Sequence, residues 1–224
     1  MSDQQANLAW RDGAIPVSTR FDDPYFSLEN GLAETAHVFL AGNDLPARFA
    51  PGFHVAELGF GTGLNLLATW AAWEASGQEG PLRFTSFEAY PMSGGEMRRA
   101  LAAFPELADH AARLVAAWEE DSSLATLDGI EARVVIGDAR RRLAETDFVA
   151  DAWFLDGFSP AKNPELWGAE LMKQVAAHTR PGGTLATYTA AGFVRRNLAE
   201  AGFEVTRVPG YGRKRHMTTG RRPQ

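Results

Sequence analysis

The chain contains no cysteine, which excludes disulfide bonds, thiolate zinc sites and cysteine nucleophiles. Histidine is also scarce, and the spacings of its five residues (His37, His54, His110, His178, His216) match no metal-ligand pattern. No apolar run approaches the roughly 20 residues that a membrane span requires, and the N-terminus is polar and acidic where a signal peptide is basic and then apolar. We therefore expect a cytoplasmic protein with no metal and no redox chemistry.

Positive charge is in short supply as well, since 22 Lys and Arg face 28 Asp and Glu, for a formal net charge of −6. This balance argues against a general nucleic-acid binder. The charge is uneven, however, because residues 195–224 hold eight basic and two acidic residues. Such a basic region is compatible with a localised phosphate contact, although a solvated surface is the simpler explanation of the cluster taken alone.

Length and composition indicate one domain, because 224 residues with 45% hydrophobic content can bury one substantial core. Short apolar runs alternate with helical patterns, which predicts an α/β fold with a seven-stranded, mostly parallel sheet and helices on both faces. The expected strands are residues 53–58, 83–88, 132–137, 151–156, 183–188, 203–208 and 214–218. The expected helices are residues 63–75, 94–104, 106–120, 138–145, 164–179 and 191–201. The turn residues at 209–212 indicate a hairpin, so the last strand is expected to run antiparallel.

Residues 1–50 fit no strand and helix repeat and contain several prolines among aromatic residues. We interpret them as an N-terminal extension packed on the domain that residues 51–224 form. No internal repeat, low-complexity tract or linker suggests a second domain.

A glycine-rich segment follows the first strand of this domain and opens its first helix. Gly59, Gly61 and Gly63 alternate after the acidic Glu57, and alternate glycines allow close approach of a ligand to the backbone at a helix N-terminus. The spacing differs from the Gly-x-Gly-x-x-Gly of pyrophosphate sites, and the preceding acid suits a cationic amino-acid moiety. The segment therefore favours S-adenosylmethionine over a dinucleotide, the alternative being a turn without a ligand.

Two acidic residues end the next strands. Glu88 lies about 25 residues beyond the glycines, where an acid can accept hydrogen bonds from both ribose hydroxyls. Asp138 could bind the exocyclic amine of an adenine. Either acid could instead cap the helix that follows it.

The most informative residue is Asp156, which apolar residues 152–155 deliver to the carboxyl end of the fourth strand. With an ordinary pKa near ~3.9 its carboxylate is a poor base, but it can accept a hydrogen bond from an amine and aim the nitrogen lone pair at a methyl donor. Two prolines fix the following loop, from which Lys162 can donate hydrogen bonds. Tyr25 and Phe158 are the aromatic residues that we expect to stack on a splayed RNA base.

Three segments stand out, namely Glu-Leu-Gly-Phe-Gly-Thr-Gly-Leu-Asn at 57–65, Phe-Leu-Asp-Gly-Phe-Ser-Pro-Ala-Lys-Asn-Pro at 154–164 and Ala-Gly-Phe-Val-Arg-Arg-Asn-Leu at 191–198. Taken together, they resemble the methyltransferase domain of the MnmC family, which serves tRNA 5-methylaminomethyl-2-thiouridine biosynthesis. The first segment is shared by many class I methyltransferases, whereas the one around Asp156 is specific to this family.

The resemblance implies a Rossmann-like class I methyltransferase that uses S-adenosylmethionine to methylate the aminomethyl nitrogen of 5-aminomethyl-(2-thio)uridine at the tRNA wobble position. Asp156 would face that amine, and the anticodon stem-loop would be the partner. The implied cofactor residues are Glu57, Gly59, Phe60, Gly61, Gly63, Asn65, Glu88 and Asp138. The implied substrate-binding residues are Tyr25, Phe158, Lys162, Arg195, Arg213 and Lys214.

One departure from the family stands out. Bifunctional members continue into a flavin-dependent oxidase, whereas this sequence shows no flavin-binding pattern up to Gln224. We therefore expect a stand-alone methyltransferase without flavin, with the oxidase as a separate partner chain if one exists. Two alternatives remain open, namely a methyl- or aminopropyltransferase that acts on a free small amine, and a non-catalytic tRNA-binding subunit for a separate oxidase.

Overall fold

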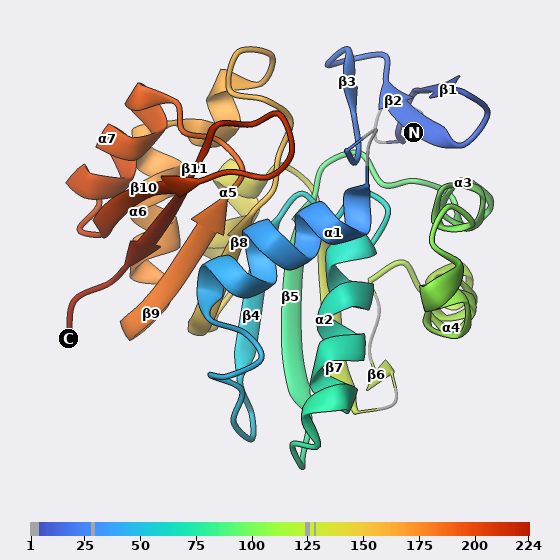
Figure 1. The fold of residues 1–224 in the computed structure, drawn as a ribbon, viewed down its shortest axis with the longest axis horizontal. Helices are drawn as coiled ribbons and strands as arrows, with labels where there is room; N and C mark the ends of the chain where they lie inside the picture. The colour runs from blue at the N-terminus through green and yellow to red at the C-terminus, as the bar shows by residue number, and fades with distance from the viewer. Residues whose placement is uncertain (1–4, 28–29, 124–125, 128) are drawn as a thin grey trace.

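The structure is a computed structural model that describes residues 5–27, 30–123, 126–127 and 129–224. A central sheet has the strand order β10-β11-β9-β8-β4-β5-β7-β6 (Figure 1). Strands β4, β5, β7, β8 and β9 are parallel, while β11 runs against both of its neighbours and β6 against β7. The strands are β4 (His54–Leu58), β5 (Leu82–Glu88), β6 (Thr126–Leu127), β7 (Ile130–Ile136), β8 (Ala150–Leu155), β9 (Thr179–Thr187), β10 (Glu204–Pro209) and β11 (His216–Arg221).

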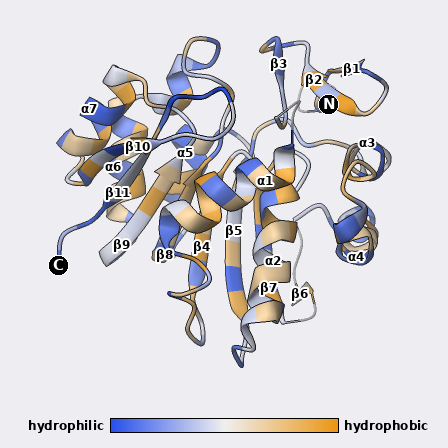
Figure 2. Cartoon of the chain, in the orientation of Figure 1, coloured by the Kyte–Doolittle hydropathy of each residue, from blue (hydrophilic) through white to orange (hydrophobic). Residues whose placement is uncertain are grey.

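Helices cover both faces of this sheet, because its central strands are apolar on both sides (Figure 2). Val55 and Phe154 contribute to one buried cluster with α2 and α4, whereas Ala56 and Trp153 contribute to a second with α6 and α7. Successive strand residues thus enter opposite layers. The helices are α1 (Gly31–Thr35), α2 (Leu64–Ser76), α3 (Gly94–Leu101), α4 (Ala108–Glu120), α5 (Ala139–Arg142), α6 (Ala169–Ala177) and α7 (Gly192–Glu200).

The predicted α/β class, the mostly parallel sheet and the antiparallel last strand are confirmed. Each of the seven predicted strands overlaps an observed one. The central sheet also contains β6, which with two residues is too short for a sequence pattern to reveal. The helix expected at 164–179 divides at Gly168, whose extended backbone separates a 3₁₀ turn, Pro164–Trp167, from α6. The helix expected at 138–145 likewise becomes α5 followed by a 3₁₀ turn, Leu143–Glu145.

The N-terminal region has more structure than the sequence patterns indicate. Strands β1 (Leu8–Arg11), β2 (Ile15–Ser18) and β3 (Asp23–Pro24) form a small antiparallel sheet (Figure 1). Helix α1 begins after Asn30, whose side chain accepts from the Ala33 amide, and continues through a π-helical turn, Ala36–Leu40. The division into an extension of residues 1–50 and a domain of residues 51–224 stays a prediction.

The strand order reverses between β4 and β8, which follow each other in the sheet but not in the sequence. In open parallel sheets ligands bind beyond the carboxyl ends of the strands at such a switch point. The glycine segment follows β4 and Asp156 follows β8, so the fold brings the two most informative sequence features together.

Candidate active site

A cavity of about 680 Å³ lies beyond the carboxyl ends of the central strands. The glycine segment and Asp156 form its floor. Residues 20–27 of the N-terminal region form one wall, and residues 211–214 of the β10–β11 connection form another. The volume is in the range of small-molecule sites.

The glycine segment adopts a backbone that only glycine accommodates. Gly59 has a φ of 91°, and a Cβ at this position would lie 2.0 Å from the carbonyl oxygen of Asp156. Gly61 and Gly63 also have positive φ, and Gly63 is the N-cap of α2. The absence of side chains lets the segment pass directly beneath the Asp156 loop.

Two acidic side chains stand at the same edge of the cavity. Glu88 is 9% exposed and accepts from the Gly61 amide (2.9 Å) and the Tyr90 amide (2.8 Å). Burial raises its pKa, and these hydrogen bonds oppose the rise. Asp138 caps α5 through the Arg140 amide (3.0 Å) and pairs with the Arg140 guanidinium, which lowers its pKa. Glu88 thus fixes the glycine segment, and Asp138 has the capping role that the sequence left open.

A buried hydrogen-bond network holds Asp156. Nδ2 of Asn65 donates to Oδ2 of Asp156 (2.7 Å) and to Oε1 of Glu57 (2.8 Å). Oδ1 of Asn65 accepts from the Thr35 hydroxyl (2.8 Å), and Ser86 donates to the other oxygen of Glu57 (2.6 Å). The side-chain amide of Asn65 is therefore hydrogen-bonded to Thr35, Glu57 and Asp156, and it directs the Asp156 carboxylate into the cavity.

The environment of Asp156 changes its acidity. Burial raises the pKa of this carboxyl to about 7, and the negative charge of Glu34 adds to the rise. The Asn65 hydrogen bond and the positive charge of Lys214 act in the opposite direction. Burial also raises the pKa of Glu57 well above its ordinary value. The charge on Asp156 therefore changes near neutral pH, where a cationic ligand would favour the ionised form.

The wall formed by the β10–β11 connection carries an ion pair with α1. Nζ of Lys214 lies 2.6 Å from Oε1 of Glu34 and 4.1 Å from the centre of the Tyr188 ring. The Tyr188 hydroxyl donates to the carbonyl oxygen of Gly157 (2.7 Å). This wall is thereby fixed to the loop that carries Asp156.

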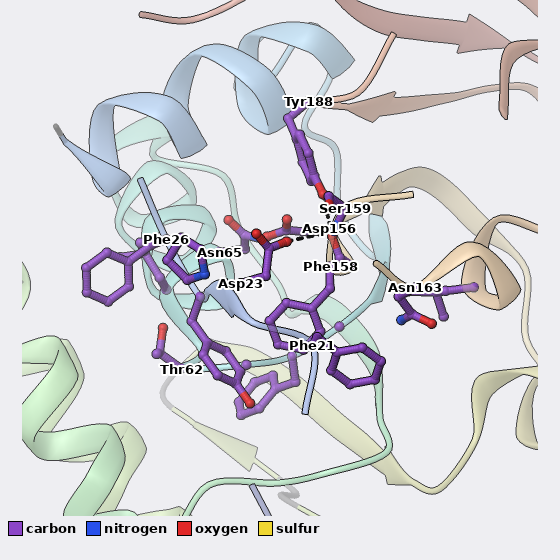
Figure 3. A pocket seen from close by; sticks show the side chains of 18 of the residues that line it. Phe21, Asp23, Phe26, Thr62, Asn65, Asp156, Phe158, Ser159, Asn163 and Tyr188 are labelled. Atoms are coloured by element: carbon purple, nitrogen blue, oxygen red, sulfur yellow. Dashed lines mark hydrogen bonds between the residues drawn. The ribbon is translucent and has the colours of Figure 1, made fainter. Parts of the chain in front are cut away.

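Aromatic rings close the cavity on the N-terminal side. Phe158 stacks on Phe21, with ring centres 4.7 Å apart, and meets the edge of Tyr25 at 5.0 Å. Figure 3 shows the Phe158 and Phe21 rings next to each other, with Asp156 near the centre of the view and Tyr188 reaching in from the other side. Asp23 accepts from the Ser159 amide (2.8 Å) and ties this segment to the Asp156 loop. One face of Phe158 is therefore covered by Phe21.

Most of the predicted site residues line this one cavity. They are Tyr25, Gly59, Phe60, Gly61, Asn65, Glu88, Asp138, Asp156, Phe158, Arg213 and Lys214. Their roles toward a ligand stay predictions.

Four predicted residues lie outside the lining. Glu57 sits behind Asn65 with both oxygens engaged, and a Cβ on Gly63 would face Leu114 of α4. Lys162 pairs with Asp22 and Asp23. Arg195 is half-buried on α7. Glu57 and Lys162 therefore contact the lining residues Asn65 and Asp23 without lining the cavity themselves, and their roles toward a ligand stay predictions.

Sequence reasoning missed several lining residues, among them Asp23, Glu34, Thr35 and Tyr188. The rule that chemistry collects at the carboxyl ends of strands could have found Tyr188, which follows β9 directly. Glu34 and Thr35 lie in α1, a helix that the pattern of strands and helices in the sequence did not predict.

The sequence of residues 104–223 matches the family described as S-adenosyl-L-methionine-dependent methyltransferase. This match covers more than half of the chain and includes the cavity residues Asp138, Asp156, Tyr188 and Lys214. The chain belongs to this family. S-adenosylmethionine is thus the methyl donor for this methyltransferase, as the glycine segment predicted.

Relatives confirm the resemblance to MnmC. The methyltransferase is 46% identical to the "tRNA 5-methylaminomethyl-2-thiouridine biosynthesis bifunctional protein MnmC" of Marinobacter nauticus, over 98% of this chain and 37% of that protein. It is also 46% identical to the MnmC of Stutzerimonas stutzeri, over 97% of this chain and 34% of that protein. The chain thus spans about a third of the length of these curated relatives.

Solved structures agree. The crystal structure of MNMC2 from Aquifex aeolicus superposes with a TM-score of 0.76 and 25% identity, covering 100% of this chain and 73% of that one. Spermidine synthase from Thermotoga maritima, with a TM-score of 0.52 and 10% identity over 96% of this chain and 71% of that one, shares the fold. Within the described part of the chain, no helix has the length and apolar composition to cross a membrane.

Proposed function

We propose that this methyltransferase transfers a methyl group from S-adenosylmethionine to the aminomethyl nitrogen of 5-aminomethyl-(2-thio)uridine at the wobble position of tRNA. The observation that carries the proposal is a half-buried carboxylate, Asp156, aimed by Asn65 into a cavity whose floor is the glycine segment. The MnmC relatives, named for the biosynthesis of the methylated nucleoside, support this choice of acceptor.

The residues present fit the donor. The glycine segment offers a surface without side chains at the N-terminus of α2, and Glu88 is an acceptor for ribose hydroxyls at its edge. When bound, S-adenosylmethionine supplies an electrophilic methyl group on a positively charged sulfur. The negative charge of the Asp156 carboxylate would stabilise this positive sulfur, and the sulfur would in turn stabilise the ionised form of a carboxyl held partly out of water.

Asp156 acts on the acceptor by position. Its carboxylate accepts a hydrogen bond from an N–H of the neutral amine, and this contact directs the nitrogen lone pair toward the methyl carbon. The N–C bond forms as the S–C bond breaks, and the proton that the product ammonium loses goes to water. Phe158 and Tyr25 give the neighbouring aromatic surface against which a splayed base would stack.

Contacts with tRNA outside the cavity are part of the same proposal. Arg213 lines the cavity, and Arg195 and Arg215 lie outside its lining; we assign to these three arginines the phosphates of the anticodon stem-loop. A flavin-dependent oxidase would supply the free aminomethyl group.

The test is methyl transfer from labelled S-adenosylmethionine to two tRNA pools, one with aminomethyluridine at the wobble position and one with only the carboxymethylaminomethyl form. We expect label in the first pool alone, and a loss of about 100-fold or more with Asp156→Ala. Binding of S-adenosylhomocysteine is the control, because it needs the glycine segment rather than the acceptor. Label in neither pool, or full activity of the variant, contradicts the proposal.

A further inference from the structure

The ion pair between Glu34 and Lys214 has no role in the chemistry described so far. Glu34 is 9% exposed on α1, and Lys214 reaches it from the β10–β11 connection at 2.6 Å. The lysine ammonium also lies 4.1 Å from the centre of the Tyr188 ring, so an aromatic face holds it from a second side. Two elements far apart in the sequence thus place one anion and one cation at fixed positions inside the cavity.

This pair is mechanically linked to Asp156 along two routes. Thr35, the neighbour of Glu34 in α1, donates to Asn65, which in turn donates to Asp156. Tyr188, beneath Lys214, donates to the carbonyl oxygen of Gly157, the residue after Asp156. Both charges reach Asp156, since Glu34 raises the pKa of its carboxyl and Lys214 lowers it, after the larger effects of burial and of Asn65.

The charges at this end of the cavity balance when the donor is bound. Asp156 and Glu34 are negative, while Lys214 and the donor sulfonium are positive. An acceptor that entered as an ammonium would add a third positive charge, and a partly dry cavity makes that cation unfavourable. In the described part of the chain, Glu57 lies behind Asn65, and the other ionisable side chains of the cavity lining are Arg20, Asp23, Tyr25, Glu88, Tyr90, Asp138, Arg140, Glu165, Tyr188, Tyr211 and Arg213.

We propose that Glu34 and Lys214 are a positioning pair that sets the protonation state of the acceptor nitrogen, so that the amine sits at Asp156 in its neutral, nucleophilic form. The inference rests on the proposed amine methylation and adds to it the means by which the lone pair is kept available. Lys214 repels a second ammonium, and Glu34 holds Lys214 against Tyr188 where it can do so.

The two members of the pair make opposite predictions, which a merely structural role does not. Single-turnover methyl transfer is measured against pH at saturating donor. Lys214→Met leaves an extra negative charge, so the pH midpoint of the rate rises by about one unit and the rate at pH 7 falls about tenfold, with recovery at high pH. Glu34→Gln leaves an extra positive charge and lowers the midpoint by a similar amount. The double variant restores the balance and returns the midpoint close to that of the wild type.

A matched control is present on the outer surface. Lys173 and Glu170 on α6 form another Lys–Glu pair at 2.7 Å, exposed to solvent and remote from the cavity lining. Lys173→Met should leave the pH midpoint unchanged. Shifts of Lys214→Met and Glu34→Gln in the same direction, or no shift in either, overturn the proposal.

Failure of the proposed function is separately visible. If the wild-type protein labels no tRNA, the ratio of its affinities for S-adenosylmethionine and S-adenosylhomocysteine is measured against pH, because that ratio follows the ionisation of Asp156. Displacement of its midpoint upward in Lys214→Met and downward in Glu34→Gln supports the electrostatic role of the pair. An unmoved midpoint in both variants overturns it.

Discussion

Asp156 illustrates how much of a residue's chemistry its surroundings decide. The sequence places one carboxylate at the end of a buried strand, and an isolated carboxyl there would titrate near pH ~4. In the folded protein, burial raises its pKa to about 7, while Asn65 holds it by a hydrogen bond of 2.7 Å. Above about pH 7 the folded protein without a ligand holds Asp156 ionised in a desolvated position, and this costs free energy of folding.

This cost predicts a pH-dependent effect of Asp156→Asn on stability. Because the folded-state pKa is raised, this carboxyl contributes most to stability at low pH, and the contribution is lost as pH rises toward about 7. Without donor, we expect the variant to unfold roughly 5 °C above the wild type at pH 8 and close to it at pH 4.5. Scanning calorimetry at the two pH values measures the difference.

Asp138→Asn is the control with the opposite sign. Arg140 lowers the pKa of Asp138, so this carboxylate contributes stability that is present at neutral pH and lost as pH falls. Its substitution should lower the unfolding temperature at pH 8. If Asp156→Asn behaved in the same way, the carboxylate of Asp156 would not be desolvated.

At the scale of elements, the short helix α1 is central to the site and absent from the sequence prediction. Its last residue, Thr35, is 4% exposed and donates to the amide that aims Asp156. A buried acceptor left without its donor costs about 1–3 kcal/mol, and here the acceptor is Oδ1 of Asn65. Helix α1 therefore supports the proposed catalytic geometry through Asn65 rather than by direct contact with Asp156.

We predict that Thr35→Val, which keeps the shape but removes the hydroxyl, lowers kcat about tenfold and changes donor affinity little. Thr35→Ser retains the donor and should keep most of the activity. Steady-state kinetics with both substrates separates the two effects. A loss of activity in the serine variant but not in the valine variant would point to packing of the methyl group as the cause.

What the sequence could predict follows from the range of the interactions involved. Strand β8 and Asp156 are encoded by adjacent residues, and the glycine segment by nine consecutive ones, so local patterns sufficed. The Glu34–Lys214 contact joins residues 180 positions apart, and nothing local announces it. For the same reason Glu57 was expected at the ligand, although the structure places it behind Asn65.

At the scale of the whole molecule, an acidic body carries a basic region beside the mouth of the cavity. Desolvation and then the positive charges of Arg207, Arg215 and Arg195 lower the pKa of His216, so these three arginines act on one side chain. The proposed binding of tRNA by a protein of net charge −6 requires such a local excess of positive charge.

We predict that Arg195→Gln combined with Arg215→Gln raises the KM for tRNA several-fold and makes the salt dependence of tRNA binding less steep by about one to two units of slope. Donor affinity should not change. Arg83→Gln combined with Arg98→Gln, which removes two arginines paired with Glu131 and Glu119 outside the cavity lining, is the charge-matched control. Filter binding across a salt series checks the slopes, and identical slopes in the two proteins would contradict the assignment.

The Glu34–Lys214 contact also bears on how the protein acquires activity as it folds. Long-range contacts of this kind can form only after the intervening chain has been brought together, which carries a loop-closure cost. The pair therefore joins the two ends of the chain at one cavity. The proposed methyl-transfer site is complete only when α1 and the β10–β11 connection have met.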